Sequence, residues 1–206
     1  MDFEPWGGNQ PENWKNKSLY DYATFINGAA FKKDQYSPSK NGLPIVKIAE
    51  LKNGITETTE YCAVQKEQKY YIFDKDILFS WSGNPETSID TFIWHHGNAI
   101  LNQHTFKVIP NSSHYSFIYC LLRYMKPEFT RIASNKQTTG LWHVTVADLK
   151  RLQFPYSDET IFEFCQNADP IIYQIYNNLF ENSRLAALRD SLLPKLMSGE
   201  LSVANL

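Results

Sequence analysis

The C-terminal part of the chain carries one long amphipathic pattern. Apolar side chains recur there in steps of three or four, at Ala168, Ile172, Ile175, Leu179, Leu185, Leu188, Leu192 and Leu196. This spacing predicts a single α-helix with one apolar stripe, which the polar Asn182 interrupts. Counted from a cap at Ser157 to Leu193, the helix would be roughly 50 Å long at about 1.5 Å per residue. A helix of that length extends beyond an ordinary domain, so we expect a second helix to cover part of its stripe.

Two residues predict where this helix stops. Pro194 has no N–H for the carbonyl of Asp190, and it disfavours helical geometry at Leu193. Gly199 can adopt the positive φ that closes a last turn. We therefore expect the helix to kink or end at Pro194.

Composition limits the kind of protein that this sequence can form. The 206 residues are 43% hydrophobic and 15% aromatic, which is enough for a substantial core. The net charge of −2 and the pI of about 6.2 exclude a protein that holds nucleic acid by bulk positive charge. Cys62, Cys120 and Cys165 lie far apart without metal-ligand spacing, which indicates reduced, buried thiols. Since no run of about 20 apolar residues occurs, we expect a cytoplasmic protein with no membrane partner.

The residues before the helix alternate between strand-like runs and turns, which predicts an α+β fold. We expect an irregular lead-in over residues 1–13, a β-rich globular domain over 14–156, and the long coiled-coil-type helix with its tail over 157–206. Strands are expected at Leu19–Phe25, Leu43–Ala49, within Tyr70–Phe79 and within Ala99–Ile109. A helix is expected from Ser116 to about Met125, ending before Pro127.

Three polar segments of the globular part have the chemistry of DNA contacts. Cations suit phosphates, while small hydroxyl and amide groups suit base edges. The candidates are Lys32, Lys33 and Tyr36; then Ser82 and Asn84 beside Trp81; then Lys136, Gln137, Thr138, Thr139 and His143. Each segment also fits an ordinary solvated turn, so both interpretations stay open from spacing alone.

Catalytic patterns in the sequence are weak. Asp34 with Glu50-Leu51-Lys52 has the composition of a Mg²⁺-dependent nuclease site, but chance supplies such triplets freely. No Gly-rich cofactor loop follows a strand, and the cysteines and histidines lack metal-site spacing. We therefore expect no catalytic residue, metal or cofactor, with a nuclease kept as a minor alternative.

Several segments resemble one known family. The run Leu192-Leu193-Pro194-Lys195-Leu196-Met197-Ser198-Gly199-Glu200-Leu201 resembles the C-terminal conserved region of the DNA-specificity subunit of type I restriction-modification enzymes. The opening segment Pro11-Glu12-Asn13-Trp14, the strand-like Gly42–Ile48 and the triplet Asn102-Gln103-His104 are similar to the recognition domains of that family.

This resemblance implies a non-catalytic subunit that recognises double-stranded DNA at a bipartite site. Its globular part would be the target-recognition domain, and its helix would dock methyltransferase (M) subunits and, through them, restriction (R) subunits. The usual subunit has two recognition domains, whereas this chain has one. We therefore expect either a natural half-subunit or an excised half, with two copies pairing through Ile172, Ile175, Leu179, Asn182, Leu185, Leu188, Leu192 and Leu196. The alternative is a scaffold whose helix serves oligomerisation without base readout.

Overall fold

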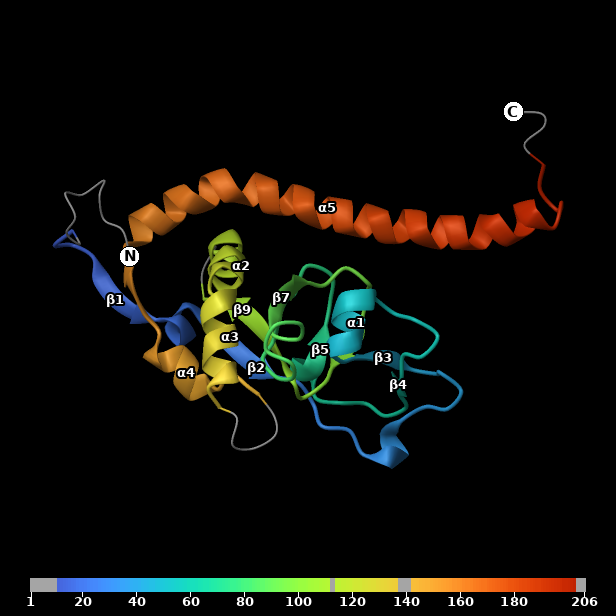
Figure 1. The fold of residues 1–206 in the computed structure, drawn as a ribbon, viewed down its shortest axis with the longest axis horizontal. Coiled ribbons are helices and arrows are strands. Elements are labelled where there is room, and N and C mark those ends of the chain that lie inside the picture. The colour runs from blue at the N-terminus through green and yellow to red at the C-terminus, as the bar shows by residue number, and fades with distance from the viewer. Residues whose placement is uncertain (1–10, 112–113, 137–141, 203–206) are drawn as a thin grey trace.

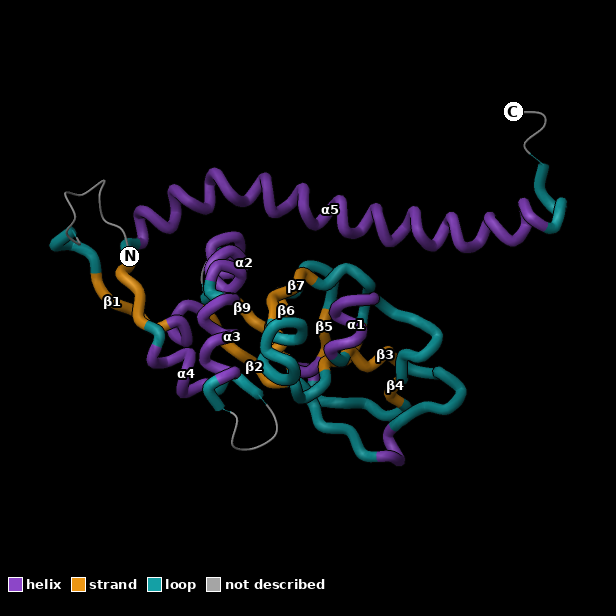
Figure 2. The backbone as a smooth tube through the Cα atoms, viewed as in Figure 1, coloured by secondary structure: helices purple, strands orange, loops and turns teal. Residues whose placement is uncertain are grey.

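The computed structural model describes residues 11–111, 114–136 and 142–202. It confirms the expected α+β class: a domain of mixed sheets and helices is followed by one long helix (Figure 1). Figure 2 shows helices α2, α3 and α4 grouped on one side of the domain, with long loops on the other. In the described part of the chain, no helix combines the length and apolar composition that a membrane span requires.

Three sheets form the domain. The first has the antiparallel order β2–β9–β6–β7, with β2 Ala23–Asn27, β9 Thr105–Pro110, β6 Ile77–Ser80 and β7 Asp90–Ile93. The second has the order β4–β3–β8–β5, with β4 Tyr61–Cys62, β3 Leu43–Val46, β8 Ala99–Leu101 and β5 Tyr71–Ile72; β3 and β8 are parallel. The third pairs β1 Lys15–Ser18 with β10 Gln153–Tyr156, directly before the long helix.

The helices are short except for the last. The 3-10 turns are η2 Leu19–Tyr22, η3 Lys33–Gln35 and η4 Gln68–Tyr70. The α-helices are α1 Ile48–Asn53, α2 Tyr115–Tyr124, α3 Lys126–Ser134, α4 Val146–Arg151 and α5 Asp158–Met197.

Strand β6 is the centre of the core because both of its faces are buried. Ile77 and Phe79 point to the cluster that the first sheet forms with α2, α3, α4 and the start of α5. Leu78 belongs to a second cluster with Val46 and Trp94, between the two larger sheets. Alternating side chains of one strand therefore join the two halves of the domain.

Two strand expectations for the domain were wrong in detail. The strand expected over Leu43–Ala49 ends at Val46, because Glu50 accepts a hydrogen bond from the backbone of Lys47 at 3.0 Å and starts α1. Leu19–Tyr22 is a 3-10 turn, so strand β2 begins only at Ala23. Pro127 follows the end of α2, but it also occupies the first turn of α3, where a missing N–H costs nothing.

Helix α5 has 40 residues and runs from Asp158 to Met197. Ser157 is its N-cap, as expected, and accepts a bond from the backbone of Thr160. Of the two outcomes expected at Pro194, a kink or an end, the end was wrong, since the helix continues through this residue to Met197. One proline removes one backbone hydrogen bond, and the flanking turns keep the others. Gly199, at φ 76°, lies just beyond the end, as expected.

Candidate nucleic-acid interface

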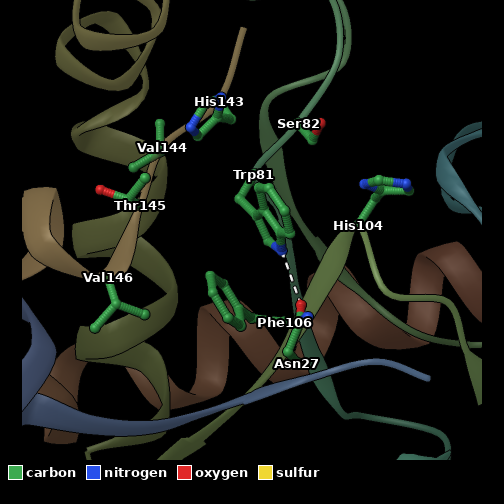
Figure 3. A pocket seen from close by; sticks show the side chains of 9 residues that line it. All are labelled: Asn27, Trp81, Ser82, His104, Phe106, His143, Val144, Thr145 and Val146. Carbon is green, nitrogen blue, oxygen red and sulfur yellow. Dashed lines mark hydrogen bonds between the residues drawn. The ribbon is translucent and has the colours of Figure 1, made fainter. Parts of the chain in front are cut away.

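A cavity of ≈ 650 Å³ opens at one edge of the first sheet (Figure 3). This is the edge at which β2 and β6 end and β9 begins. Its walls combine aromatic and aliphatic side chains with a few polar groups. The lining residues are Asn27, Trp81, Ser82, His104, Phe106, His143, Val144, Thr145 and Val146. Pockets of this kind, mostly apolar with a few polar groups, are typical of binding sites.

Trp81 lies at the centre of this cavity and is held from several sides. Its indole Nε1 donates to Asn27 Oδ1 at 3.0 Å (Figure 3). Its backbone carbonyl accepts from Val144 N at 2.8 Å, which ties the end of β6 to the segment before α4. The ring lies 5.7 Å from that of His104 and 6.4 Å from that of His143, between centroids. The cavity is therefore formed in advance of any ligand.

The structure brings two of the predicted DNA residues together in this cavity. Ser82 and His143 form a β-bridge, and both line the cavity. Ser82 is only 4% exposed. Asn84 lies nearby in sequence but uses its side-chain oxygen to accept from the backbones of Glu86 and Thr87, at 3.0 Å each.

Lys136 lies just beyond the end of α3 and is engaged inside the protein. Its ammonium pairs with the carboxylate of Asp148, whose side chain is 1% exposed. Burial alone would raise the pKa of Asp148, but hydrogen bonds from Lys136 and Thr145 outweigh it and lower the pKa to about 2. Lys136 thus has a structural partner, and a DNA contact by it stays a prediction. Gln137, Thr138 and Thr139 lie outside the described residues.

The predicted basic segment lies elsewhere on the domain. Lys32 and Lys33 are exposed beside η3, at the bottom of the view and opposite α5 (Figure 1). Tyr36 is half-buried, 6.0 Å from Phe31 between ring centroids and 5.4 Å from the Lys47 ammonium. Lys32 and Lys33 do not line the cavity, but they remain free to meet a phosphate backbone.

Comparison with known proteins decides what kind of domain carries this cavity. Residues 11–179 match the family model described as "Type I restriction modification DNA specificity domain". The chain belongs to this family. It is 27% identical over 228 residues to the type I restriction enzyme MjaIX specificity subunit of Methanocaldococcus jannaschii, covering 100% of this chain and 51% of the relative. It is 26% identical over 200 residues to the HindI specificity subunit of Haemophilus influenzae, covering 93% and 42%.

Solved structures of similar fold agree with this assignment. The HsdS subunit of Thermoanaerobacter tengcongensis has a TM-score of 0.55 at 20% identity, covering 95% of this chain and 47% of that one. The S subunit from M. genitalium has a TM-score of 0.56 at 15% identity, covering 92% and 47%. At these identities the likeness shows the fold. The chain spans about half the length of the specificity subunits that it matches.

The apolar stripe of α5 divides into a docked part and an exposed part. Ile172 was expected at a partner interface, but it is 6% exposed because it packs against the chain's own domain. Ile175 and Leu179 line a groove of ≈ 580 Å³ between α5 and the domain. The remaining stripe residues are 38–49% exposed: Leu185, Leu188, Leu192 and Leu196. Asn182 is exposed as well.

The same groove contains a histidine with an altered pKa. Burial and the adjacent His95, whose ring lies 4.0 Å away, lower the pKa of His96 to about 4, although Asp74 opposes this. Gly54 has φ 71°, and a Cβ there would approach the His96 ring to 2.7 Å. His96 is therefore packed as a neutral side chain in the groove beneath Ile175 and Leu179 of α5.

The residues of the nuclease alternative have other roles. Glu50 is 7% exposed and accepts from the Lys47 backbone and from Thr59 Oγ1 at 3.2 Å, so it caps α1. Asp34 lies in the exposed turn η3. Within the ranges that the structure describes, no three acidic, histidine or cysteine side chains group as a metal site.

Asn27 and His104 are among the lining residues that were not predicted as site residues. Asn27 was recognised only as part of a turn, and its bond to Trp81 joins residues 54 positions apart, which no local pattern reveals. His104 stood in a triplet similar to the family, but without a spatial partner its role was open. The fold brings both to the end of β6.

Proposed function

We propose that this chain recognises DNA by base sequence, as the recognition part of a type I specificity subunit that directs M and R subunits to a bipartite site. The observation that carries the proposal is the gathering of Ser82, His104 and His143 around Trp81 at one sheet edge, in a domain of this family. Such a protein acts on the cell's own DNA and therefore works in the cytoplasm.

The chemistry of the cavity edge suits base readout. A hydroxyl can donate or accept at a base edge, and an imidazole can do either according to its tautomer. His104 supports such a contact, because its Nδ1 is buried without a hydrogen-bond partner among the described residues, and a buried polar group without a partner regains about 1–3 kcal/mol when it finds one. Gln137, Thr138 and Thr139, on the adjoining segment, belong to the same proposal.

Phosphate contacts are assigned to exposed lysines away from the cavity. Lys32 and Lys33 lie on the side of the domain opposite α5, so DNA held there leaves the helix accessible (Figure 1). With a net charge of −2, the chain alone offers little bulk attraction to DNA. Tight binding then depends on the complete complex with its M subunits.

We further propose that two copies pair through the exposed part of α5. A single domain reads one half of a bipartite site, and the chain spans about half of its relatives. Four leucines of the stripe, Leu185, Leu188, Leu192 and Leu196, lie beyond the last residue of α5 that faces the domain groove, Ser183. An antiparallel two-fold pair would bury them and place the two domains at opposite ends. The exposed Asn182 would then fix the register of the pair.

The test begins with the complete system. The chain is co-expressed with an M subunit, and modified bases are mapped in the genomic DNA; a bipartite motif is expected. Duplexes with that motif and with random sequence then serve for anisotropy titrations. A chain that dimerises but gives no sequence-dependent binding or modification would be the scaffold alternative.

Two variants separate base reading from phosphate binding. Ser82→Ala should weaken binding to the motif by about 1–3 kcal/mol and change random binding little, whereas Lys32→Ala should weaken both and lower the salt slope by about 1. Ser39→Ala, on the exposed turn near η3, is the matched control. Equal losses on both duplexes for Ser82→Ala would contradict the base-reading role.

A further inference from the structure

The position of α5 on the domain depends on a small number of contacts. Its first turns are anchored by Ile161 and Cys165, which are 4% and 3% exposed, and by Phe164, whose ring lies 6.0 Å from that of Phe117. Figure 1 shows the helix rising to a point above α2 and then turning to run past the rest of the domain. The direction after that turn decides where its far end lies.

Pro170 makes the helix weak just after this first anchor. It lies inside α5 and has no N–H for the carbonyl of Gln166, so one bond of the helical ladder is missing. Proline is among the usual causes of helix bending. The segment beyond Pro170 therefore needs contacts of its own to keep one direction relative to the domain.

Lys75 supplies the contact directly after Pro170. Its ammonium lies 5.1 Å from the ring centroid of Tyr173 and 5.0 Å from that of Tyr176, two neighbours on one side of α5. Cations attract the faces of aromatic rings at such distances. Close by, Ser116 donates a hydrogen bond to Asp169, at the proline itself.

The backbone of Lys75 is held firmly enough to act as a fixed point. Its N–H donates to Trp94 O at 2.8 Å, and its carbonyl accepts from Tyr115 Oη at 2.7 Å. Its φ is 74°, in the left-handed region that a non-glycine residue rarely adopts. Such strain persists where the surroundings enforce it, and it is a reason to look for a function.

One apolar contact lies in the same place, since Ile172 is 6% exposed against the domain. A groove of ≈ 420 Å³ separates α5 from the domain around Lys75, Tyr173 and Tyr176, and the ≈ 580 Å³ groove follows beneath Ile175 and Leu179. Because open grooves lie on both sides, Ile172 and the Lys75 cation beside the two rings are the contacts that hold this stretch.

We propose that Lys75 is a positioning residue that sets the direction of α5 and thereby the gap between the two halves of the DNA site. The second statement rests on the proposed function. From Tyr176 to Met197 the helix spans roughly 30 Å at about 1.5 Å per residue, so a turn of about 10° moves Met197 by roughly 5 Å, and Ser191 by roughly 4 Å. That displacement exceeds the rise of about 3.4 Å per base pair. A residue that touches no base thus determines which sites are accepted.

The direction of α5 is measured without DNA. Spin labels at Ser134→Cys on the domain and Ser191→Cys on the helix, in a Cys120→Ala background diluted with unlabelled chain, report one distance distribution by pulsed dipolar spectroscopy. Lys75→Gly removes the ammonium and suits the positive φ, so the turn stays folded while the distance distribution spreads by roughly 4 Å, as for a turn of about 10°. Lys75→Arg, which keeps a cation, retains the narrow distribution.

The chain offers a matched control and a second way to break the contact. Lys40 is also a lysine at positive φ, 57°, in a turn away from α5, so Lys40→Gly makes the same chemical change and leaves the distribution unaltered. The double variant with Tyr173→Leu and Tyr176→Leu keeps Lys75 but removes both rings, so it should spread the distance distribution as Lys75→Gly does. An unchanged distribution in Lys75→Gly, or an equal change in Lys40→Gly, would overturn the positioning role.

The number of base pairs between the two half-sites is then determined by mapping modified bases in genomic DNA. Lys75→Gly is expected to keep both half-sites and to alter or blur the gap between them. An unaltered gap despite a spread distance distribution would overturn the link to spacing. A wild type that modifies no bipartite motif would overturn the proposed function instead, and the dipolar distances would still decide the role of Lys75.

Discussion

Asp148→Asn is the substitution whose effect follows most directly from the structure. The carboxylate accepts from Lys136, from Arg151, from Thr145 N at 2.7 Å and from Thr145 Oγ1 at 2.6 Å. These bonds connect the end of α3 to the start of α4 and hold the segment that carries His143. An asparagine of the same shape removes the charge and leaves Lys136 without its counter-ion.

The expected loss can be estimated in two ways. The fall of the pKa of Asp148 from 3.8 to about 2 corresponds to roughly 2–3 kcal/mol, at about 1.36 kcal/mol per pKa unit. Removing one partner of a buried ion pair costs about 3–5 kcal/mol, less here because the side chain of Arg151 is 73% exposed. We therefore expect Asp148→Asn to lower the free energy of unfolding by about 2–3 kcal/mol.

Urea unfolding, followed by circular dichroism, measures this loss. The control is Glu128→Gln, which breaks the exposed pair with Arg131 and should cost less than about 1 kcal/mol. Because the folded-state pKa of Asp148 is lowered, its contribution is present above pH 4 and is lost as the pH falls from 3.8 towards 2. The difference in the free energy of unfolding between wild type and Asp148→Asn should therefore decrease as the pH falls through this range. A loss no larger than that of Glu128→Gln would refute the reasoning.

Three further outcomes are expected. The pKa of His96 is lowered from 6.5 to about 4, so the folded protein loses stability as the pH falls through this range. The substitution His96→Gln should reduce this acid-dependent loss in the free energy of unfolding by about 1–2 kcal/mol, measured in urea titrations. Gly28→Ala should destabilise by at least about 2 kcal/mol, since a Cβ would meet a backbone carbonyl at 2.2 Å, whereas Gly97→Ala meets open space and costs about 1 kcal/mol of backbone strain. Leu185→Asp with Leu188→Asp should dissociate the proposed pair in analytical ultracentrifugation while domain fluorescence stays native; a dimeric double variant would contradict pairing there.

Local sequence patterns predicted the elements that depend on interactions between residues close together in the sequence. The stripe and the Ser157 cap predicted α5, and the alternating runs predicted most strands of the domain. The errors occur where a distant or competing contact decides. Val46 is followed by a helix because the side chain of Glu50 reaches back to a backbone N–H, and Leu19–Tyr22 forms a 3-10 turn where a strand was expected.

The chemical character of the candidate site could be predicted from the sequence, but the full set of residues that line it could not. Residue chemistry and the resemblance indicated polar loops near Trp81, and the cavity gathers Ser82 and His143 there. Composition gave no sign that Asn27 would orient the indole, because that bond spans two strands. Nor could spacing show that Lys136 pairs with Asp148, or that Ile172 packs on its own domain, since both depend on how separate elements meet.

Strand β6 connects the two sites on which the proposed function depends. Lys75 and Asp76 precede it at the end that faces α5, and Trp81 and Ser82 follow it at the cavity. From Lys75 to Trp81 the chain advances by six residues, so at about 3.3 Å per residue the two sites are no more than roughly 20 Å apart. Both of its faces are buried, so the strand cannot bend without disturbing both core clusters. A domain that reads bases at one end of such a strand and holds the helix at the other keeps base contacts and helix direction in one rigid frame, which a fixed gap between half-sites requires.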